Sequence, residues 1–209
     1  MAFIRAQAPT EEIDYNFLMG CLADYQRPRE KITQLLKNKV LIRVKKGLYV
    51  FGEAYKKGPY SLEILSNLIY GPSYISKEYA LAFYGMIPER VHVVTSMTSK
   101  RNKIFSTDLG RFSYRHLALH KYSEGVAWVL IGSNQHILIA TKEKALADLI
   151  ADVKEIKTVE DLEEYLTVSL RIDETQLRRL GKKKLQAIAK VYQHPIVSLL
   201  PQLIAKLAS

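Results

Sequence analysis

Residues 27–52 read RPREKITQLLKNKVLIRVKKGLYVFG, and the architecture expected for the N-terminal part of the chain follows from them. The first half of this stretch carries apolar side chains at helical spacing and predicts a helix. Pro28 precedes them, at a position where the first turn of a helix tolerates proline. These apolar residues are Ile32, Leu35, Leu36 and Val40. The second half alternates along Leu41–Lys45, turns at Lys46-Gly47 and returns along Leu48–Phe51, which predicts a hairpin whose glycine has a positive φ.

The side of the expected helix that lies opposite Ile32 is polar and mainly basic, because successive side chains advance by about 100°. A polar helix joined directly to a hairpin with a cationic tip is typical of a winged helix-turn-helix, in which the helix enters the major groove and the wing contacts the flanking backbone. The candidate DNA contacts are Arg27, Arg29, Lys31, Thr33, Gln34 and Lys37 in the helix, and Arg43, Lys45 and Lys46 in the hairpin. The alternative is an amphipathic helix beside an ordinary surface hairpin.

The charge of the chain favours an anionic partner. The formal net charge is +10, and between Gly20 and Val50 eight Lys and Arg residues face only two acidic ones, a local +6. The excess is therefore concentrated where DNA contacts are expected. A second basic run, Lys182–Lys184 beside Arg178 and Arg179, is either a solvated start of a helix or a second phosphate-binding surface.

The composition is typical of a folded protein with one or two domains, since 48% of its 209 residues are hydrophobic. The single cysteine, Cys21, excludes an internal disulfide and suggests a buried thiol in a reducing compartment. Neither a signal-type segment nor an apolar run of membrane-spanning length is apparent in the sequence. We therefore expect a cytoplasmic protein that does not bind membranes.

The residues before the basic stretch predict one supporting helix. Thr10 is placed to cap a helix that runs to about Leu22, with apolar residues on one side. Met1–Pro9 shows little pattern. Only two helices are therefore expected ahead of the hairpin.

A polar segment bounded by glycine and proline, GEAYKKGP at residues 52–59, predicts a domain boundary. The DNA-binding domain is accordingly assigned to residues 1–58 and a second domain to residues 59–209. The second domain divides into an α+β core at residues 59–150 and a helical tail at residues 151–209.

Within the second domain, caps and periodicity locate the elements. Ser61, Ser76 and Thr141 are placed to cap three helices. Residues rich in β-branched and aromatic side chains predict strands at 91–97, 103–106, 112–119, 126–132 and 136–139. The tail predicts helices at about 159–169, 174–180, 182–192 and 195–208. The expected fold class is α+β, with a winged helix-turn-helix, an antiparallel sheet and a helical tail.

Four segments resemble the successive blocks of the AbiEi family of type IV antitoxins and related transcriptional regulators. They are LIRVKKGLYVFG (41–52), GPSYISKEYALAFYGMIP (71–88), VHVVTSMTSKRNKIFSTDLGRFSYRHL (91–117) and IATKEKALADLI (139–150). The distinctive pieces are Ser-x-x-x-Ala-Leu followed by Tyr-Gly, then Gly-x-Phe-x-Tyr-Arg-His, then Glu-Lys-Ala-Leu-x-Asp. The resemblance covers the chain from Asp14 to Ile150.

This resemblance implies an antitoxin of a type IV toxin-antitoxin system, active in abortive infection as a defence against phage. The N-terminal domain would bind double-stranded operator DNA, with inverted repeats expected, and repress its own operon. The second domain would counteract a nucleotidyltransferase toxin without forming a stable complex. No cofactor is implied, and the oligomeric state stays open. The polar motif members of the implied antitoxin region are Ser76, Arg115, Lys144 and Asp148.

Each of these four residues also has a structural interpretation. Ser76 suits a helix cap better than a nucleophile, because an apolar helical run follows it. Lys144 and Asp148 are four residues apart and can form an ion pair across one helical turn. Arg115 lies on a predicted strand, where it either lines a domain interface or contacts a partner.

The sequence leaves two other functions open, a stand-alone transcriptional regulator and a DNA-directed nuclease. A nuclease needs clustered carboxylates and a lysine, for which Asp108, Glu143 and Lys144 are the candidates. Glu143 and Lys144 are adjacent and would point apart, so we expect no catalysis. His116 and His120 would suit a metal ion only on a helix, and we expect no metal site.

Overall fold

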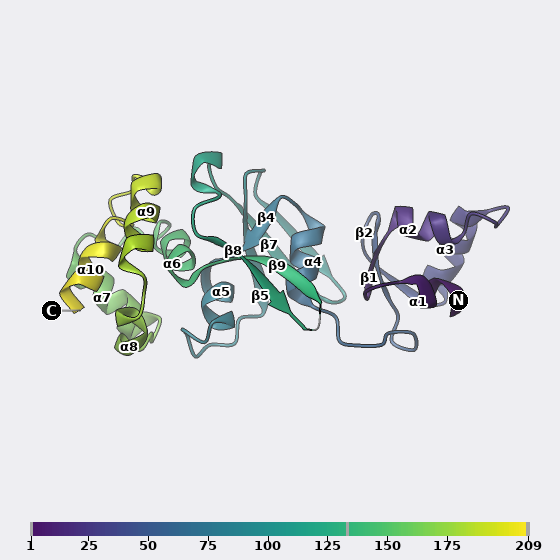
Figure 1. The fold of residues 1–209 in the computed structure, drawn as a ribbon, viewed down its shortest axis with the longest axis horizontal. Helices are drawn as coiled ribbons and strands as arrows, with labels where there is room; N and C mark the ends of the chain where they lie inside the picture. The colour runs from purple at the N-terminus through teal and green to yellow at the C-terminus, as the bar shows by residue number, and fades with distance from the viewer. Residues whose placement is uncertain (1, 133, 208–209) are drawn as a thin grey trace.

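The computed structural model describes residues 2–132 and 134–207, and the fold is α+β, as expected (Figure 1). An N-terminal module of short helices and a small sheet lies at one end of the molecule. A larger sheet flanked by helices lies in the middle, and the C-terminal helices lie at the other end. The first and last helices are therefore far apart.

The N-terminal module has a three-stranded antiparallel sheet in the order β1-β3-β2 and three short helices. Its elements are α1 (Ala2–Gln7), β1 (Glu12–Asp14), α2 (Tyr15–Cys21), α3 (Pro28–Lys37), β2 (Leu41–Lys45) and β3 (Leu48–Phe51). The expected basic helix and hairpin are confirmed as α3 and β2–β3, and Gly47 has a φ of +85°. Ile32 and Leu35 of α3 are buried in the small core of this module.

The helix expected from Thr10 to Leu22 is wrong in its first part. Glu12–Asp14 forms β1, which pairs with β3, so tertiary pairing overrides the local helical pattern. The helix α2 begins only after Asp14, whose Oδ1 accepts a hydrogen bond from the N–H of Phe17 at 2.7 Å. Asp14 is therefore the cap, and the hydroxyl of Thr10 instead donates to the carbonyl of Glu12 at 2.8 Å.

The third helix, α1, lies in the segment where the sequence showed little pattern. Ile4 is its buried residue. Arg5 also fixes this helix to the module. Its guanidinium lies 4.2 Å from the ring centre of Phe51 and 3.2 Å from the carboxylate of Glu11. The module thus has one helix more than the sequence predicted.

The central sheet has six strands in the order β6-β7-β5-β4-β9-β8. The strands are β4 (Ser73–Ile75), β5 (Val93–Thr98), β6 (Lys103–Thr107), β7 (Gly110–His116), β8 (Val126–Ile131) and β9 (Gln135–Ala140). The pairs β5–β7 and β4–β9 are parallel, so the sheet is mixed and the expectation of an antiparallel sheet is wrong. Side-chain alternation reveals which face a residue occupies, but not the direction of the neighbouring strand.

Helices cover both faces of the sheet (Figure 1). On one face lies α4 (Leu62–Ile69), whose Ser66 carbonyl accepts a hydrogen bond from the hydroxyl of Tyr114 at 2.6 Å. The helices α5 (Lys77–Phe83) and α6 (Lys142–Ile150) lie on the other side. Ser61 caps α4 and Thr141 caps α6 through their side-chain oxygens, as expected.

The expected helical tail is confirmed as α7 (Val159–Glu164), the π-helical turn η2 (Tyr165–Ser169), α8 (Glu174–Arg178), α9 (Lys182–Tyr192) and α10 (Leu199–Leu207). Its buried side chains, among them Leu185, Ile188 and Leu203, belong to the same apolar core as the sheet. The tail therefore packs as part of the second domain. None of the helices in the described part of the chain is long and apolar enough to cross a membrane.

The hairpin β2–β3 lies between the two cores. All four residues of β3 are buried, with Tyr49 and Phe51 in the N-terminal core. Val44, Leu48 and Val50 instead belong to the core of the second domain. Because alternate side chains point to opposite faces of a strand, the hairpin joins the two parts of the molecule with one face toward each.

The connection after the hairpin requires glycine at residue 52. A Cβ atom at Gly52 would lie 1.8 Å from the carbonyl oxygen of Lys39, while the Gly52 N–H donates to the carbonyl of Val40 at 2.8 Å. We expect Gly52→Ala to lower the free energy of unfolding by about 2 to 4 kcal/mol, measured by urea denaturation, because backbone must move to make room.

The matched control for this change is Gly20→Ala in α2. Apart from the neighbouring backbone of α2 itself, no atom of the described residues lies within 4 Å of the position that a Cβ would take there. The control is therefore expected to leave stability unchanged, or to raise it by about 0.5 to 1 kcal/mol through the better helix propensity of alanine. Equal stabilities for the two variants would contradict the close approach at residue 52.

Candidate nucleic-acid interface

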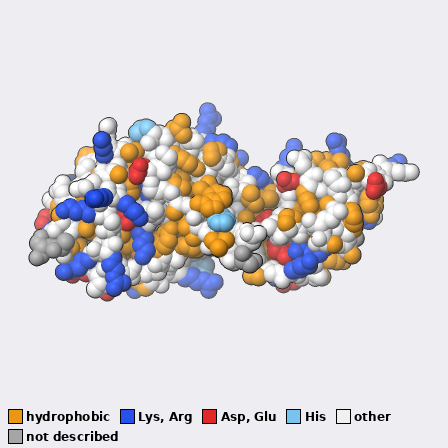
Figure 2. All heavy atoms as spheres, in the orientation of Figure 1, with side chains coloured by type: hydrophobic (Ala, Val, Ile, Leu, Met, Phe, Trp, Pro, Cys, Tyr) orange, Lys and Arg blue, Asp and Glu red, His pale blue; other side chains and the backbone are white. Residues whose placement is uncertain are grey.

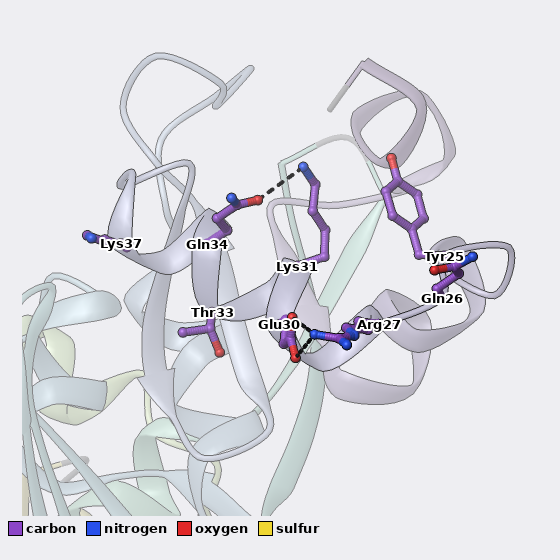
Figure 3. Close-up of a pocket in the computed structure, with 8 residues that line it drawn as sticks. All are labelled: Tyr25, Gln26, Arg27, Glu30, Lys31, Thr33, Gln34 and Lys37. Atoms are coloured by element: carbon purple, nitrogen blue, oxygen red, sulfur yellow. Dashed lines mark hydrogen bonds and ion pairs between the residues drawn. The ribbon is translucent and has the colours of Figure 1, made fainter.

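The outward face of α3 forms the floor of a shallow hollow of about 600 Å³ at the far end of the N-terminal module (Figure 3). Five of the expected DNA contacts border it, namely Arg27, Lys31, Thr33, Gln34 and Lys37. The sixth, Arg29, is exposed on the same helix. Tyr25 and Gln26, in the turn before the helix, complete the hollow and were not predicted. The structure therefore brings the expected helical residues together on one solvent-facing surface.

Hydrogen bonds and ring contacts along α3 orient several of these side chains. Arg27 pairs with Glu30 at 3.3 Å, although both side chains remain largely exposed, at 75% and 69%. Lys31 lies 3.5 Å from the Oε1 of Gln34 and has its ammonium 5.8 Å from the ring centre of Tyr25. Figure 3 shows the side chains of Lys31, Gln34 and Lys37 in a row along one side of the helix. Such exposed contacts are weak, so these groups are available to a ligand.

The three hairpin candidates lie in different environments. Arg43 and Lys46 are exposed. Lys45 is half-buried, and its ammonium donates to the carbonyls of Leu68 and Ile69 at the end of α4. Burial lowers the pKa of Lys45, and the nearby charges of Lys100 and Lys103 lower that pKa further. Lys45 thus anchors the hairpin to the second domain.

Lys100 and Lys103 place further positive charge beside the hairpin. Both ammonium groups lie over the ring of Tyr70, at 5.2 and 5.5 Å from its centre, and Lys103 also lies 4.9 Å from the ring centre of Phe105. No sequence pattern predicts that the turn between β5 and β6 lies next to the hairpin. Figure 2 shows further Lys and Arg side chains on the N-terminal module and over the C-terminal helices.

Three of the four residues of the implied antitoxin region meet in the core of the second domain. Asp148 is buried and accepts hydrogen bonds from Ser76 at 2.6 Å, from Tyr74 at 2.9 Å and from Tyr192. Burial raises the pKa of Asp148, whereas the charge of Lys144 and the three hydroxyl groups oppose that rise. Ser76 occupies the expected N-cap position of α5, but its side chain makes no capping hydrogen bond and its hydroxyl donates to Asp148 instead.

Lys144 is also fully buried but does not form the expected ion pair. Its ammonium donates to the carbonyl of Lys121 and lies 4.5 and 5.6 Å from the ring centres of Tyr192 and Tyr74. Among the ion pairs of the described residues, none joins Lys144 to Asp148. Burial lowers the pKa of Lys144, and the charge of Asp148 opposes that shift. These contacts make a buried polar cluster of Tyr74, Ser76, Lys144, Asp148 and Tyr192, which links sheet, α6 and α9.

The remaining candidates lie apart from that buried polar cluster. Arg115 is exposed on β7. Of the nuclease candidates, Asp108 lies in the exposed turn between β6 and β7, while Glu143 is buried and accepts the N–H of Gly181 at 2.9 Å. His116 lies on β7 and His120 in the short helical turn η1 (Leu119–Lys121), both exposed. The described residues contain no group of three His, Cys, Asp or Glu side chains placed to hold a metal ion.

Fold and site together define an α+β protein with a basic helix–hairpin module packed on a mixed-sheet domain. A comparison with protein-family models gives no match, and a comparison with curated proteins also gives none. Among solved structures, the chain is similar to the crystal structure of the Rv2827c protein from Mycobacterium tuberculosis, with a TM-score of 0.55 and 16% sequence identity. The similarity covers 98% of this chain and 79% of that one, and at this identity it concerns the fold alone.

Proposed function

We propose that this chain is a DNA-binding autorepressor and antitoxin whose α3 enters the major groove of operator DNA. The observation that carries the proposal is the outward face of α3. It presents long basic and amide side chains, with Glu30 as its one acidic member, to solvent at the end of the N-terminal module. Lys and Arg side chains neutralise phosphates, and glutamine can bind both polar groups of an adenine edge.

The order of elements in the N-terminal module supports this proposal. Helix, strand, two helices and a hairpin follow one another, in the order typical of winged helix-turn-helix domains, and α2 and α3 are joined by a short turn. Because Lys45 is engaged by α4, we assign the wing contacts to Arg43 and Lys46 and give Lys45 an anchoring role.

The antitoxin part of the proposal rests on the resemblance to the AbiEi family. Ser76, Lys144 and Asp148 are buried, so in this account they maintain the second domain and do not touch a toxin. Arg115 is exposed and is the motif member that can contact a partner directly. A nucleotidyltransferase-like protein encoded directly downstream would support the antitoxin function. Without such a neighbour, the stand-alone regulator becomes the better proposal.

A growth assay with the full-length chain separates the two activities. Cells producing the co-encoded toxin would receive either the wild-type chain or a variant with Arg27, Lys31 and Lys37 changed to alanine. We expect both chains to restore growth equally at equal protein level, because the altered residues lie on α3 and at its N-cap, outside the second domain. Loss of rescue in the variant alone would contradict the assignment of antitoxin activity to the second domain.

Gln34 is expected to contribute sequence specificity. The change Gln34→Ala should remove about 1 to 3 kcal/mol of discrimination at a single base pair, because one bidentate contact to a base edge is lost. Binding to operators with each base pair varied in turn would measure this. A matched control is Gln186→Ala, which removes an exposed glutamine from α9. An unchanged base preference in Gln34→Ala would place base recognition elsewhere.

A further inference from the structure

The face of the central sheet that lies opposite α4 carries a groove made of two adjoining hollows. They measure about 290 and 470 Å³, and both are lined by Glu78, Val93 and Thr95. The groove follows β5, with α5 on one side and the uncovered strands β7 and β6 on the other. The DNA-binding surface proposed above uses none of these residues, whereas Arg115, which also borders the groove, is the residue proposed above to contact a partner.

The smaller hollow is basic. Arg111, Ser113 and Arg115 alternate along β7 and therefore point to the same side, away from Tyr114, which bonds to α4. The two arginines are about 13 Å apart along the strand, at about 3.3 Å per residue, with Ser113 midway. Lys77 lies at the rim, where its ammonium pairs with Asp152, and Glu78 is the acidic residue of the wall.

The donors of this basic hollow are unoccupied. Neither guanidinium group, of Arg111 or of Arg115, has a hydrogen bond or ion pair with any of residues 2–132 or 134–207. Within the same described ranges, the side-chain hydroxyls of Thr95 and Ser113 also lack a partner. Each of the two arginines can bind phosphate oxygens, since guanidinium binds phosphate through paired hydrogen bonds. Their spacing along the strand suits two phosphate groups better than one.

The larger hollow has an apolar part formed by Ile87, Val91, Val93 and Leu170, and the backbone there connects α5 to β5. Its other lining residues are Glu78, Glu89, Arg90, Thr95 and Ser169, and Glu89 is paired with Arg171. A groove with a cationic end and an apolar end fits a ligand with the same division. A nucleotide has this division into a charged part and an apolar part, because its phosphates are anionic and its base has two apolar faces.

We propose that this groove binds a nucleotide unit, with phosphate at Arg111 and Arg115 and the base beside Ile87, Val91 and Leu170. The unit belongs either to a free nucleotide or to a single-stranded nucleic acid. This groove and the α3 surface are separate sites. The groove lies on one face of the central sheet, whereas α4 and the hairpin, which belongs to the same module as α3, lie on the opposite face.

Calorimetric titration of the full-length chain tests the proposal, with ATP, inorganic triphosphate and a short single-stranded DNA as the probes. The key variant is Arg111→Gln/Arg115→Gln. The matched control is Lys154→Gln/Lys157→Gln, which removes the same charge from exposed positions between α6 and α7. We expect the key variant to weaken binding by about tenfold or more and the control to change it by less than about twofold.

Each outcome of the titration either supports or overturns the proposed nucleotide site. Binding of ATP that the key variant weakens identifies a free nucleotide, whereas binding of the single strand alone identifies a nucleotide unit within a strand. ATP should bind more tightly than inorganic triphosphate if the base occupies the apolar hollow. The proposal is overturned if the wild type binds neither ATP nor the single strand, if both double variants weaken binding equally, or if ATP binds but no more tightly than inorganic triphosphate. Because Arg111 and Arg115 are exposed, their substitution should not disturb the fold. Equal melting temperatures of the wild type and the variants will verify this.

Discussion

Changing Arg27, Lys31 and Lys37 together to alanine is expected to lower the affinity for operator DNA by on the order of 100-fold at moderate salt. The three side chains border the same hollow on α3, and each is placed to neutralise a phosphate. Each lost phosphate contact should also flatten the dependence of log affinity on log salt by about 0.9, so the slope should fall by about 2.7. Fluorescence anisotropy with labelled DNA at several salt concentrations measures both quantities.

A second triple variant controls for net charge. Changing Lys182, Lys183 and Lys184 to alanine removes the same three charges from the exposed start of α9. Its affinity and salt slope should stay close to those of the wild type. If this variant weakens binding as much as the α3 variant does, long-range charge and not the surface of α3 accounts for the binding.

Changing Asp148 to alanine should produce the largest loss of stability in the second domain. The carboxylate is buried and accepts hydrogen bonds from Tyr74, Ser76 and Tyr192. Its removal leaves three buried hydroxyl groups without their acceptor and takes a negative charge away from the buried Lys144. We expect the free energy of unfolding to fall by about 3 to 5 kcal/mol, as measured by chemical denaturation.

Two further variants make this prediction specific. Tyr192→Phe removes only one of the three donors and should lower stability by about 1 kcal/mol. Glu174→Ala removes an exposed carboxylate that pairs with Arg178 on the surface of α8, and it should have a small effect. A loss for Asp148→Ala no larger than that for Glu174→Ala would show that the buried polar cluster does not hold the tail to the sheet.

Much of the N-terminal module could be predicted because its signals are local. The apolar spacing of α3 and the Lys46-Gly47 turn were sufficient to locate the helix and the hairpin. In contrast, β1 and β4 have only three residues each and are too short for side-chain alternation to be recognised. Their existence depends on pairing with β3 and with β5 and β9, which sequence alone does not reveal.

The α3 surface could also be predicted, because a single helix carries its expected members. The role of Lys45 could not be predicted, since the carbonyls that it binds are 23 and 24 residues further along the chain. The motif residues Ser76 and Asp148 could be named from the resemblance, but their mutual hydrogen bond could not. Tyr192 lies outside the segments that resemble the family, and no pattern marks it as a partner of Asp148.

Because the hairpin is buried between the two parts of the molecule, the function of each part should be tested in the full-length chain. Val44, Leu48 and Val50 are buried in the core of the second domain, so a cut within residues 52–59 would expose apolar surface on both fragments. Growth assays with separate halves would therefore confuse loss of folding with loss of function. Point variants of the full-length chain avoid this difficulty.

Footprinting of the full-length chain on the DNA upstream of its own coding sequence tests directly whether α3 binds the operator. We expect a bounded protected region that persists in an excess of unrelated DNA and disappears when Arg27, Lys31 and Lys37 are changed to alanine. Protection should survive in the matched variant of Lys182, Lys183 and Lys184. The absence of a bounded footprint, or an unchanged footprint in the α3 variant, would contradict the proposal that α3 binds the operator.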